Sequence, residues 1–318
     1  MIKITSKKLS SFLAKADVLS KDLIPIKNDA SKRYYYRIKK KNTNLLVMDS
    51  SQEKKSLKNF IFLSKWLINK GYSAPTVLSA NLSKGCCITE DFGNQKFSNL
   101  TKKNLSKKYE VAIKLLSVIS KEAPPSNLNN FTKLIFFKEL SLFINWYLYR
   151  NKNSSHSSLL LWKNIWNELF DKLSSYKHES IILRDFHVDN LFWLKERNGI
   201  KKIGLIDFQD ALIGHPCYDL VSLLQDVRVF ISYKEQMKLL DYYISINQLN
   251  ERLFREHYII FGTQRLIKII GIFYRLKYKY NKNIYMKYLP RTWQLLKKNL
   301  QNNSLKNLSK WFNKYVFK

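Results

Sequence analysis

The stretch LRDFHVDN at residues 183–190, followed by GLIDFQ at residues 204–209, decides the fold. Apolar runs around these two polar stretches predict short buried strands, and a hairpin of such strands would gather Asp185, Asn190 and Asp207 at one end. A carboxylate and an amide oxygen suit a hard cation such as Mg²⁺ that also binds phosphate oxygens. A further carboxylate could orient an attacking hydroxyl and accept its proton.

The order and spacing of these residues match the catalytic loop of protein kinases, R-D-x-x-x-x-N, followed by an aspartate at the next strand end. A histidine two residues after the aspartate, His187, resembles the small-molecule branch of that fold, the aminoglycoside phosphotransferase and choline kinase family. IDFQDA at 206–211 and GHPCYDL at 214–220 resemble the metal-binding strand and following helix of the same family. The resemblance implies an α+β, protein-kinase-like two-lobed fold and a small-molecule kinase that uses ATP and Mg²⁺ on an alcohol acceptor.

Further pieces resemble one bacterial subgroup, the anomeric sugar kinases of cell-wall recycling. The resemblance covers roughly residues 20–280. It implies phosphorylation of N-acetylmuramate or N-acetylglucosamine at the C1 hydroxyl, and a functional link to a sugar-1-phosphate nucleotidyltransferase. Another small alcohol, such as an aminoglycoside, choline or homoserine, remains open as the acceptor. The pieces are Asp29-Ala30-Ser31 with Arg33 and Tyr35, residues 46–49, residues 90–93, Gln264-Arg265 and residues 271–273.

The resemblance also assigns roles residue by residue. Asp185 would orient or deprotonate the acceptor hydroxyl, and Asn190 and Asp207 would hold Mg²⁺ against the ATP phosphates. Ser31 would lie in the turn over the phosphates, with Arg33 as a phosphate contact. The hinge between the lobes, whose backbone groups would meet the adenine, is Glu90, Asp91 and Phe92.

Four residues are candidates for contact with the substrate, and each also has a structural interpretation. His187 could instead fix the loop, and Asp189 could be a solvated loop acid. Asp210 could stabilise its turn, and Arg265, on an apolar helix, could pair with a buried acid. Asp219 precedes a helical stripe and is expected to brace a loop or cap a helix.

Two departures from the family pattern bear on activity. The phosphate loop has no G-x-G-x-x-G, and the lysine of the third strand is missing, because its place falls near Met48-Asp49. Arg33, Arg37 or a lysine of Lys54-Lys55 is the candidate to replace its charge. The gap leaves open a pseudokinase, but the intact set around Asp185 argues for an active enzyme.

The pattern along the whole chain predicts two lobes. The N-lobe, residues 1–92, would bind nucleotide, and the helical C-lobe, residues 93–318, would carry the catalytic loop and the substrate pocket. In the N-lobe, a stripe from Leu57 to Leu67 that ends at Gly71 predicts one prominent helix. Further stripes begin near Leu105, Phe136 and Leu159, and the chain after residue 219 is helical in pattern. Strands are predicted at 23–27, 34–38, 45–48, 77–78, 86–89, 180–183, 191–194 and 203–206.

The composition is strongly basic, with 56 Lys and Arg against 24 Asp and Glu, a net charge of +32. Only 11 of the 56 are Arg, whereas nucleic-acid sites use Arg heavily, so we expect a solvated lysine surface and no nucleic-acid partner. A basic pseudokinase that binds nucleic acid is the alternative from another class. Three cysteines cannot build a disulfide framework. With no signal-peptide core and only an interrupted apolar run at 258–276, we expect a cytoplasmic protein without a membrane partner.

Overall fold

The computed structural model describes residues 7–26, 32–39, 44–100, 105–151, 155–174, 176 and 179–317. The chain forms two compact units. The first unit comprises Met1–Ala112 and Val188–Ala211, and the second comprises Ile113–His187 and Leu212–Lys318. The lobe boundary at residue 92 remains a prediction, and packing groups residues 188–211 with the N-terminal segment.

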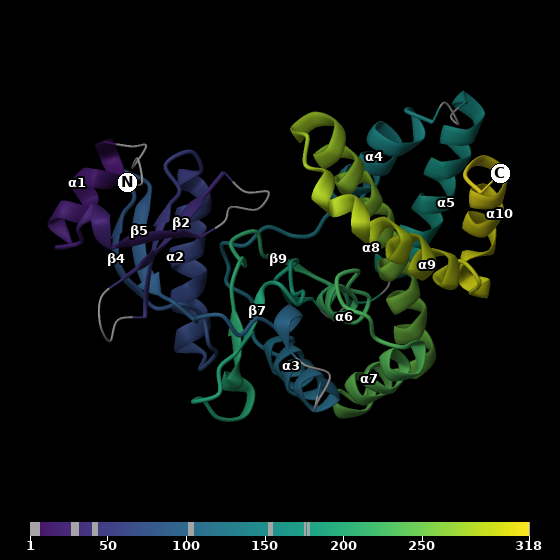
Figure 1. Cartoon of the computed structure of the whole chain (residues 1–318). Coiled ribbons are helices and arrows are strands. Elements are labelled where there is room, and N and C mark those ends of the chain that lie inside the picture. Colours follow the sequence, from purple (N-terminus) through teal and green to yellow (C-terminus); the bar gives the residue numbers. More distant parts are fainter. Residues whose placement is uncertain are drawn as a thin grey trace. The chain divides into compact units, whose positions relative to one another are not determined.

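The first unit contains the predicted five-stranded sheet, in the order β1-β2-β3-β5-β4 with every neighbouring pair antiparallel (Figure 1). Each strand is short and rich in β-branched, aromatic or other apolar residues, as strand formation requires. The strands are β1 (Leu23–Ile26), β2 (Tyr34–Ile38), β3 (Leu45–Asp49), β4 (Val77–Asn81) and β5 (Cys86–Glu90).

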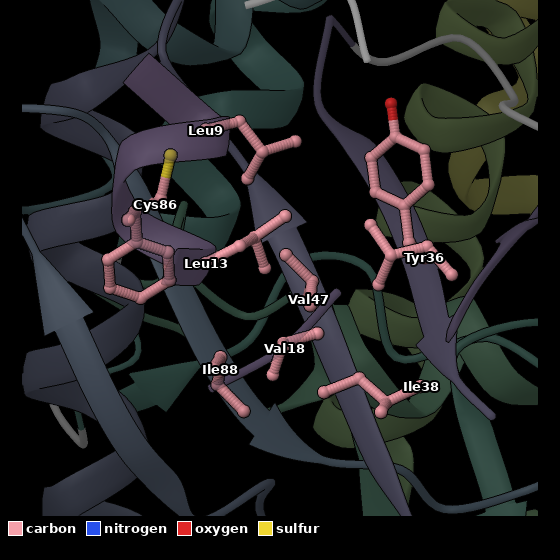
Figure 2. Packing of buried hydrophobic residues seen from close by; sticks show 10 residues of the cluster. Leu9, Leu13, Val18, Tyr36, Ile38, Val47, Cys86 and Ile88 are labelled. Carbon is pink, nitrogen blue, oxygen red and sulfur yellow. The ribbon is translucent and has the colours of Figure 1, made fainter. Parts of the chain in front are cut away.

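Helices cover both faces of this sheet (Figure 1). Because side chains alternate along a strand, Val47 of β3 faces one side and Met48 the other, and both are buried. The side of Val47 is covered by α1 (Lys7–Lys15), a helix that the sequence analysis did not predict. The other side is covered by the predicted helix α2 (Lys54–Asn69). Figure 2 shows the core under α1, formed by Leu9, Leu13, Val18, Tyr36, Ile38, Val47, Cys86 and Ile88.

A second hairpin of the first unit carries two of the predicted site residues at its ends. Strand β7 (Leu191–Trp193) pairs antiparallel with β8 (Ile203–Leu205). Gly204 of β8 is required by packing, because a Cβ there would lie 2.8 Å from the ring of Phe92. The ring of Phe92 also packs edge-on against Phe192 at 5.8 Å, so the hairpin is fixed to the chain segment that follows β5.

The second unit is mainly helical, as predicted, and its longest helix is α8 (Glu251–Tyr280). Helix α8 packs closely on α4 (Lys133–Phe143), because Gly271 has no side chain where a Cβ would lie 2.3 Å from the carbonyl carbon of Leu142. The unit also contains the short antiparallel pair β6 (Ser180–Ile182) and β9 (Leu212–Gly214), of which β9 was not predicted. The other helices are α3 (Leu105–Ile119, which begins in the first unit), α5 (His156–Ser174), α6 (Cys217–Leu224), α7 (Tyr233–Ile246), α9 (Leu289–Asn299) and α10 (Lys306–Tyr315).

A π-helical turn, Ile144–Leu148, extends α4, so the stripe predicted to reach Tyr147 is continuous but not α-helical throughout. Over the residues that the structure describes, no helix combines the length and the apolar character needed to cross a membrane.

Candidate active site

The β7–β8 hairpin brings two of the predicted metal ligands together. Asn190 directly precedes β7, and Asp207 follows β8 by two residues. The N–H of Ile206 donates to the carbonyl of Asn190 at 3.1 Å, which closes the hairpin next to both side chains. As a result, Asn190 Nδ2 lies 3.5 Å from Asp207 Oδ2. One end of a single hairpin therefore presents an amide and a carboxylate side by side.

The carboxylate of Asp207 is held in one orientation. Its Oδ1 accepts hydrogen bonds from Arg33 Nη2 at 2.7 Å and from Gln209 Nε2 at 2.9 Å, whereas its Oδ2 faces Asn190. The backbone of Asp207 has φ +60°, a left-handed conformation that costs a residue with a side chain about 1 kcal/mol or more and is typical of functional positions. A carboxylate oxygen of Asp207 and the amide oxygen of Asn190 would suit Mg²⁺, which takes few ligands from the protein and the rest from phosphate and water, once the amide turns its oxygen toward the ion in place of the Nδ2 that faces Asp207.

The residues that follow Asp207 fix this conformation to helix α2. The ring of Phe208 stacks on that of Phe60, with centroids 5.3 Å apart and planes inclined by 8°. The side chain of Asn59 donates to the carbonyl of Gln209 at 3.3 Å. The sequence analysis did not single out Gln209. Because its side chain is buried and donates to Asp207 Oδ1, it helps to orient that carboxylate.

Arg33 contacts a predicted metal ligand, unlike the other candidates for the missing lysine charge. It is 8% exposed, and its Nε lies 3.7 Å from Glu53 Oε2, just before α2. Burial lowers the pKa of Arg33, but Tyr35 and the carboxylates of Asp207 and Glu53 raise it above its ordinary value, so the guanidinium stays charged.

The other candidates lie elsewhere in the first unit. Arg37 pairs with Asp91 and donates to the carbonyl of Gly93 at 2.8 Å. Lys54 and Lys55 are exposed on the first turn of α2. Asp49, near the family's lysine position, is buried and accepts the N–H of Ser51 at 2.9 Å.

The predicted hinge residues are bound tightly within the first unit. The carboxylate of Glu90 pairs with Arg197, and that of Asp91 accepts the N–H of Gly93 at 2.8 Å. The N–H of Glu90 donates to the carbonyl of Thr76 at 2.9 Å, and the N–H of Asp91 donates to that of Asn44 at 2.7 Å. An adenine contact through either N–H would therefore require breaking one of these bonds.

In the second unit, Asp219 of α6 braces the loop that carries Asp185. Its carboxylate accepts the N–H of Leu183 at 2.6 Å and the N–H of Arg184 at 2.9 Å. Burial raises the pKa of Asp219 to about 7, although the two N–H donors favour its charged form. The loop then turns tightly, because the N–H of Asp185 donates to the carbonyl of Leu183 at 2.9 Å, and the N–H of His187 donates to that of Asp185 at the same distance.

A buried carboxylate, Glu139 of α4, binds the side chain of Arg184. Its Oε1 accepts from Arg184 Nη2 at 2.6 Å and from Lys268 Nζ at 2.7 Å. Its Oε2 accepts from Gln264 Nε2 at 3.0 Å and from the hydroxyl of Tyr218 at 3.2 Å. Burial alone would raise the pKa of Glu139, but the neighbouring cations, Lys268 first, hold it at about 2.

The sequence analysis missed Glu139 and Lys268, although a signal was present. Both are charged residues on otherwise apolar helical stripes, which places each in the core and requires a partner. Arg265 was expected either to bind substrate or to pair with a buried acid. It is 5% exposed, donates to the hydroxyl of Ser222 at 2.5 Å, and its charge favours the charged form of the buried Asp219.

The remaining predicted residues differ in exposure. His187 is buried, Asp189 is half-buried, and Asp210 is exposed and accepts from Gln209 Nε2 at 3.4 Å. Ser31, predicted in the phosphate turn, lies outside the described residues.

Comparison with known proteins identifies the family. A family model described as "APH: Phosphotransferase enzyme family" matches residues 22–255. The chain belongs to this family. It is a small-molecule kinase, as the sequence analysis predicted.

Two relatives of this chain are named as kinases of small molecules, in agreement with the family. A protein of Caulobacter vibrioides named N-acetylmuramate/N-acetylglucosamine kinase is 31% identical over 270 residues, covering 81% of this chain and 74% of the relative. A protein of the same name from Pseudomonas aeruginosa is 29% identical over 288 residues, covering 86% of this chain and 82% of the relative.

Among solved structures, ADP-bound aminoglycoside phosphotransferase APH(2'')-Ib matches with a TM-score of 0.64 at 15% identity, covering 92% of this chain and 97% of that one. The predicted protein-kinase-like fold is thereby confirmed.

Proposed function

We propose that the protein transfers the γ-phosphoryl group of ATP to the anomeric hydroxyl of an amino sugar, N-acetylmuramate or N-acetylglucosamine. The observation that carries the proposal is the 31% identity, over 81% of the chain, with a protein named for this activity. The ADP-bound structural neighbour supports ATP as the phosphoryl donor. The sugar 1-phosphate would serve peptidoglycan recycling, with a nucleotidyltransferase as the consumer of the product.

In the first unit, Asn190 and Asp207 would hold Mg²⁺, and Arg33 would contact the ATP phosphates. The ion, when bound, neutralises charge on the transferred phosphoryl group. Arg33 is suited to this role because it is charged, buried and already oriented by Asp207. It would thus supply the cation that other kinases take from the third strand. Glu90, Asp91 and Phe92 would form the adenine hinge, and Ser31 the turn over the phosphates.

In the second unit, Asp185 would orient the acceptor hydroxyl and accept its proton. His187 and Arg265 are buried, which favours a role in holding the loop and α6 over direct sugar contact. Asp189 and Asp210 are more accessible, and their carboxylates are the candidates for bonds to sugar hydroxyls.

The test is a panel of acceptors assayed by ADP release in the presence of Mg²⁺, followed by NMR of the product from N-acetylmuramate. We expect turnover of amino sugars and a phosphate on C1. Asp185→Asn should abolish turnover while a thermal shift with Mg-ATP shows that nucleotide still binds. Turnover of choline without turnover of amino sugars would overturn the sugar assignment, and an active Asp185→Asn protein would overturn the role of Asp185.

A further inference from the structure

The residue immediately before Asp185 has an unfavourable backbone conformation. Arg184 has φ +67°, which residues with a side chain rarely adopt. Such a conformation persists only where the surroundings impose it. Asp219 supplies one restraint by accepting two backbone N–H groups, and Glu139 supplies another by binding the guanidinium. The direction of the chain entering Asp185 therefore depends on carboxylates from two different helices, α6 and α4.

Glu139 is the carboxylate that balances the positive charges of this cluster. Two cations, the buried Lys268 and the partly exposed Arg184, share its Oε1. Removing Glu139 would leave the buried Lys268 and the partly exposed Arg184 with one counter-charge fewer, and the two cations would repel each other. Removing Lys268 would instead leave a balanced pair of one carboxylate and one guanidinium. The two substitutions are therefore not equivalent for the loop, although both disrupt the same buried ion pair.

We propose that Glu139 is a positioning residue for phosphoryl transfer, acting on Asp185 through Arg184. The inference rests on the proposed function, in which Asp185 orients the acceptor hydroxyl. Glu139 fixes the side chain of Arg184, Asp219 fixes its backbone, and together they set the direction of Asp185. Lys268 supports the cluster by donating to the same oxygen of Glu139 as Arg184, and its loss leaves the Glu139–Arg184 contact in place.

The experiment compares Glu139→Gln with Lys268→Met. Glu139→Gln should lower kcat by between about 10-fold and 100-fold, the effect of a small misplacement of a catalytic group, with KM for ATP within about twofold of the parent value. Lys268→Met should lower the thermal stability at least as much as Glu139→Gln does, but it should lower kcat much less. A role in packing alone predicts the opposite pattern, a loss of kcat that follows the loss of stability in both variants.

Hydrogen–deuterium exchange of the segment 180–190 gives a readout that does not depend on turnover. We expect faster exchange there in Glu139→Gln than in Lys268→Met. The matched control is Glu256→Gln, which removes a carboxylate of the same unit from its ion pair with Lys172 (2.7 Å) and should change neither kcat nor exchange in this segment. Equal exchange in the two cluster variants, or an unchanged kcat in a folded Glu139→Gln protein, would overturn the proposal.

Failure of the proposed function is recognised separately. Absence of amino-sugar turnover in the parent protein would reject that function, whereas the exchange comparison would still decide whether Glu139 holds the loop. Arg184→Met provides a second test, because it removes the intermediary itself. Arg184→Met should show the same faster hydrogen–deuterium exchange over 180–190 as Glu139→Gln. Exchange as slow as in the parent protein would contradict the proposal that Glu139 acts through Arg184.

Discussion

Replacement of Arg33 by methionine tests whether this residue supplies the missing lysine charge. The change removes the guanidinium from Asp207 Oδ1, 2.7 Å away, and from Glu53 Oε2, 3.7 Å away. A hydrogen bond to a charged group contributes about 1.5–3 kcal/mol. The side chain of Asp207 is 35% exposed, so water can replace the lost donor, and we expect the free energy of unfolding to fall by about 1.5 kcal/mol, the lower end of that range.

The expected effect of Arg33→Met on catalysis is larger than its effect on stability. A preorganised donor aimed at developing charge contributes about 2.7–4 kcal/mol to the transition state, which corresponds to a rate factor of about 10²–10³. We expect kcat/KM for ATP to fall by that factor, because no neighbouring candidate cation contacts Asp207 in the described part of the first unit. For Arg33→Lys, kcat/KM for ATP should lie between the values of the parent protein and of Arg33→Met, because lysine keeps the charge but not the planar fork of donors.

The assay is ADP release at saturating acceptor, with urea unfolding as the measure of stability. Arg255→Met is the control, because Arg255 pairs with Glu251 (2.9 Å, i,i+4 on α8) and with Asp241, both acids are more than half exposed, and exposed pairs contribute only about 0.2–1 kcal/mol each. A folded Arg33→Met protein whose kcat/KM for ATP stays within about twofold of the parent value would refute the assignment of Arg33 to the phosphates.

Two predictions concern stability. Gly271→Ala should lower the free energy of unfolding by about 3 kcal/mol, at the upper end for overpacking, because the new Cβ would meet the backbone of Leu142 at 2.3 Å; urea unfolding measures this, and a change below about 0.5 kcal/mol would show that α4 and α8 separate easily. In the folded protein Asp219 has a pKa of about 7, above its ordinary 3.8. The stability that its protonated form contributes is therefore full below about pH 4 and is lost as the pH rises to about 7. Asp219→Asn should remove this decline, and an unchanged slope of unfolding free energy against pH would contradict the assignment.

The hairpin that carries Asn190 and Asp207 was predictable, because apolar strand runs flank polar loops and the spacing constrains which side chains meet. The five strands of the first sheet were predictable for the same reason. Helix α1 was missed even though Leu9, Phe12 and Leu13 have helical spacing, because lysines and serines dominate that segment. Strand β9 has three residues, too few to show any period.

The parts that escaped prediction depend on contacts between residues distant in the sequence. Glu139 and Lys268 are separated by 129 positions, and local periodicity indicates only that each is buried, not that they meet. The choice among Arg33, Arg37 and Lys54-Lys55 depends on the direction of a side chain at the start of β2, which no pattern of residue types specifies. Whether the four candidate substrate residues contact a sugar stays a prediction.

The ion pair between Glu139 and Arg184 has a consequence for regulation. Many protein kinases order their active segment only after a phosphate group is added and captured by arginine. Here a carboxylate of the same chain already pairs with the arginine beside Asp185, and only 23% of that arginine side chain is exposed. A kinase built in this way needs no covalent on-switch at this position, so its flux would follow the supply of acceptor and nucleotide and the amount of protein made.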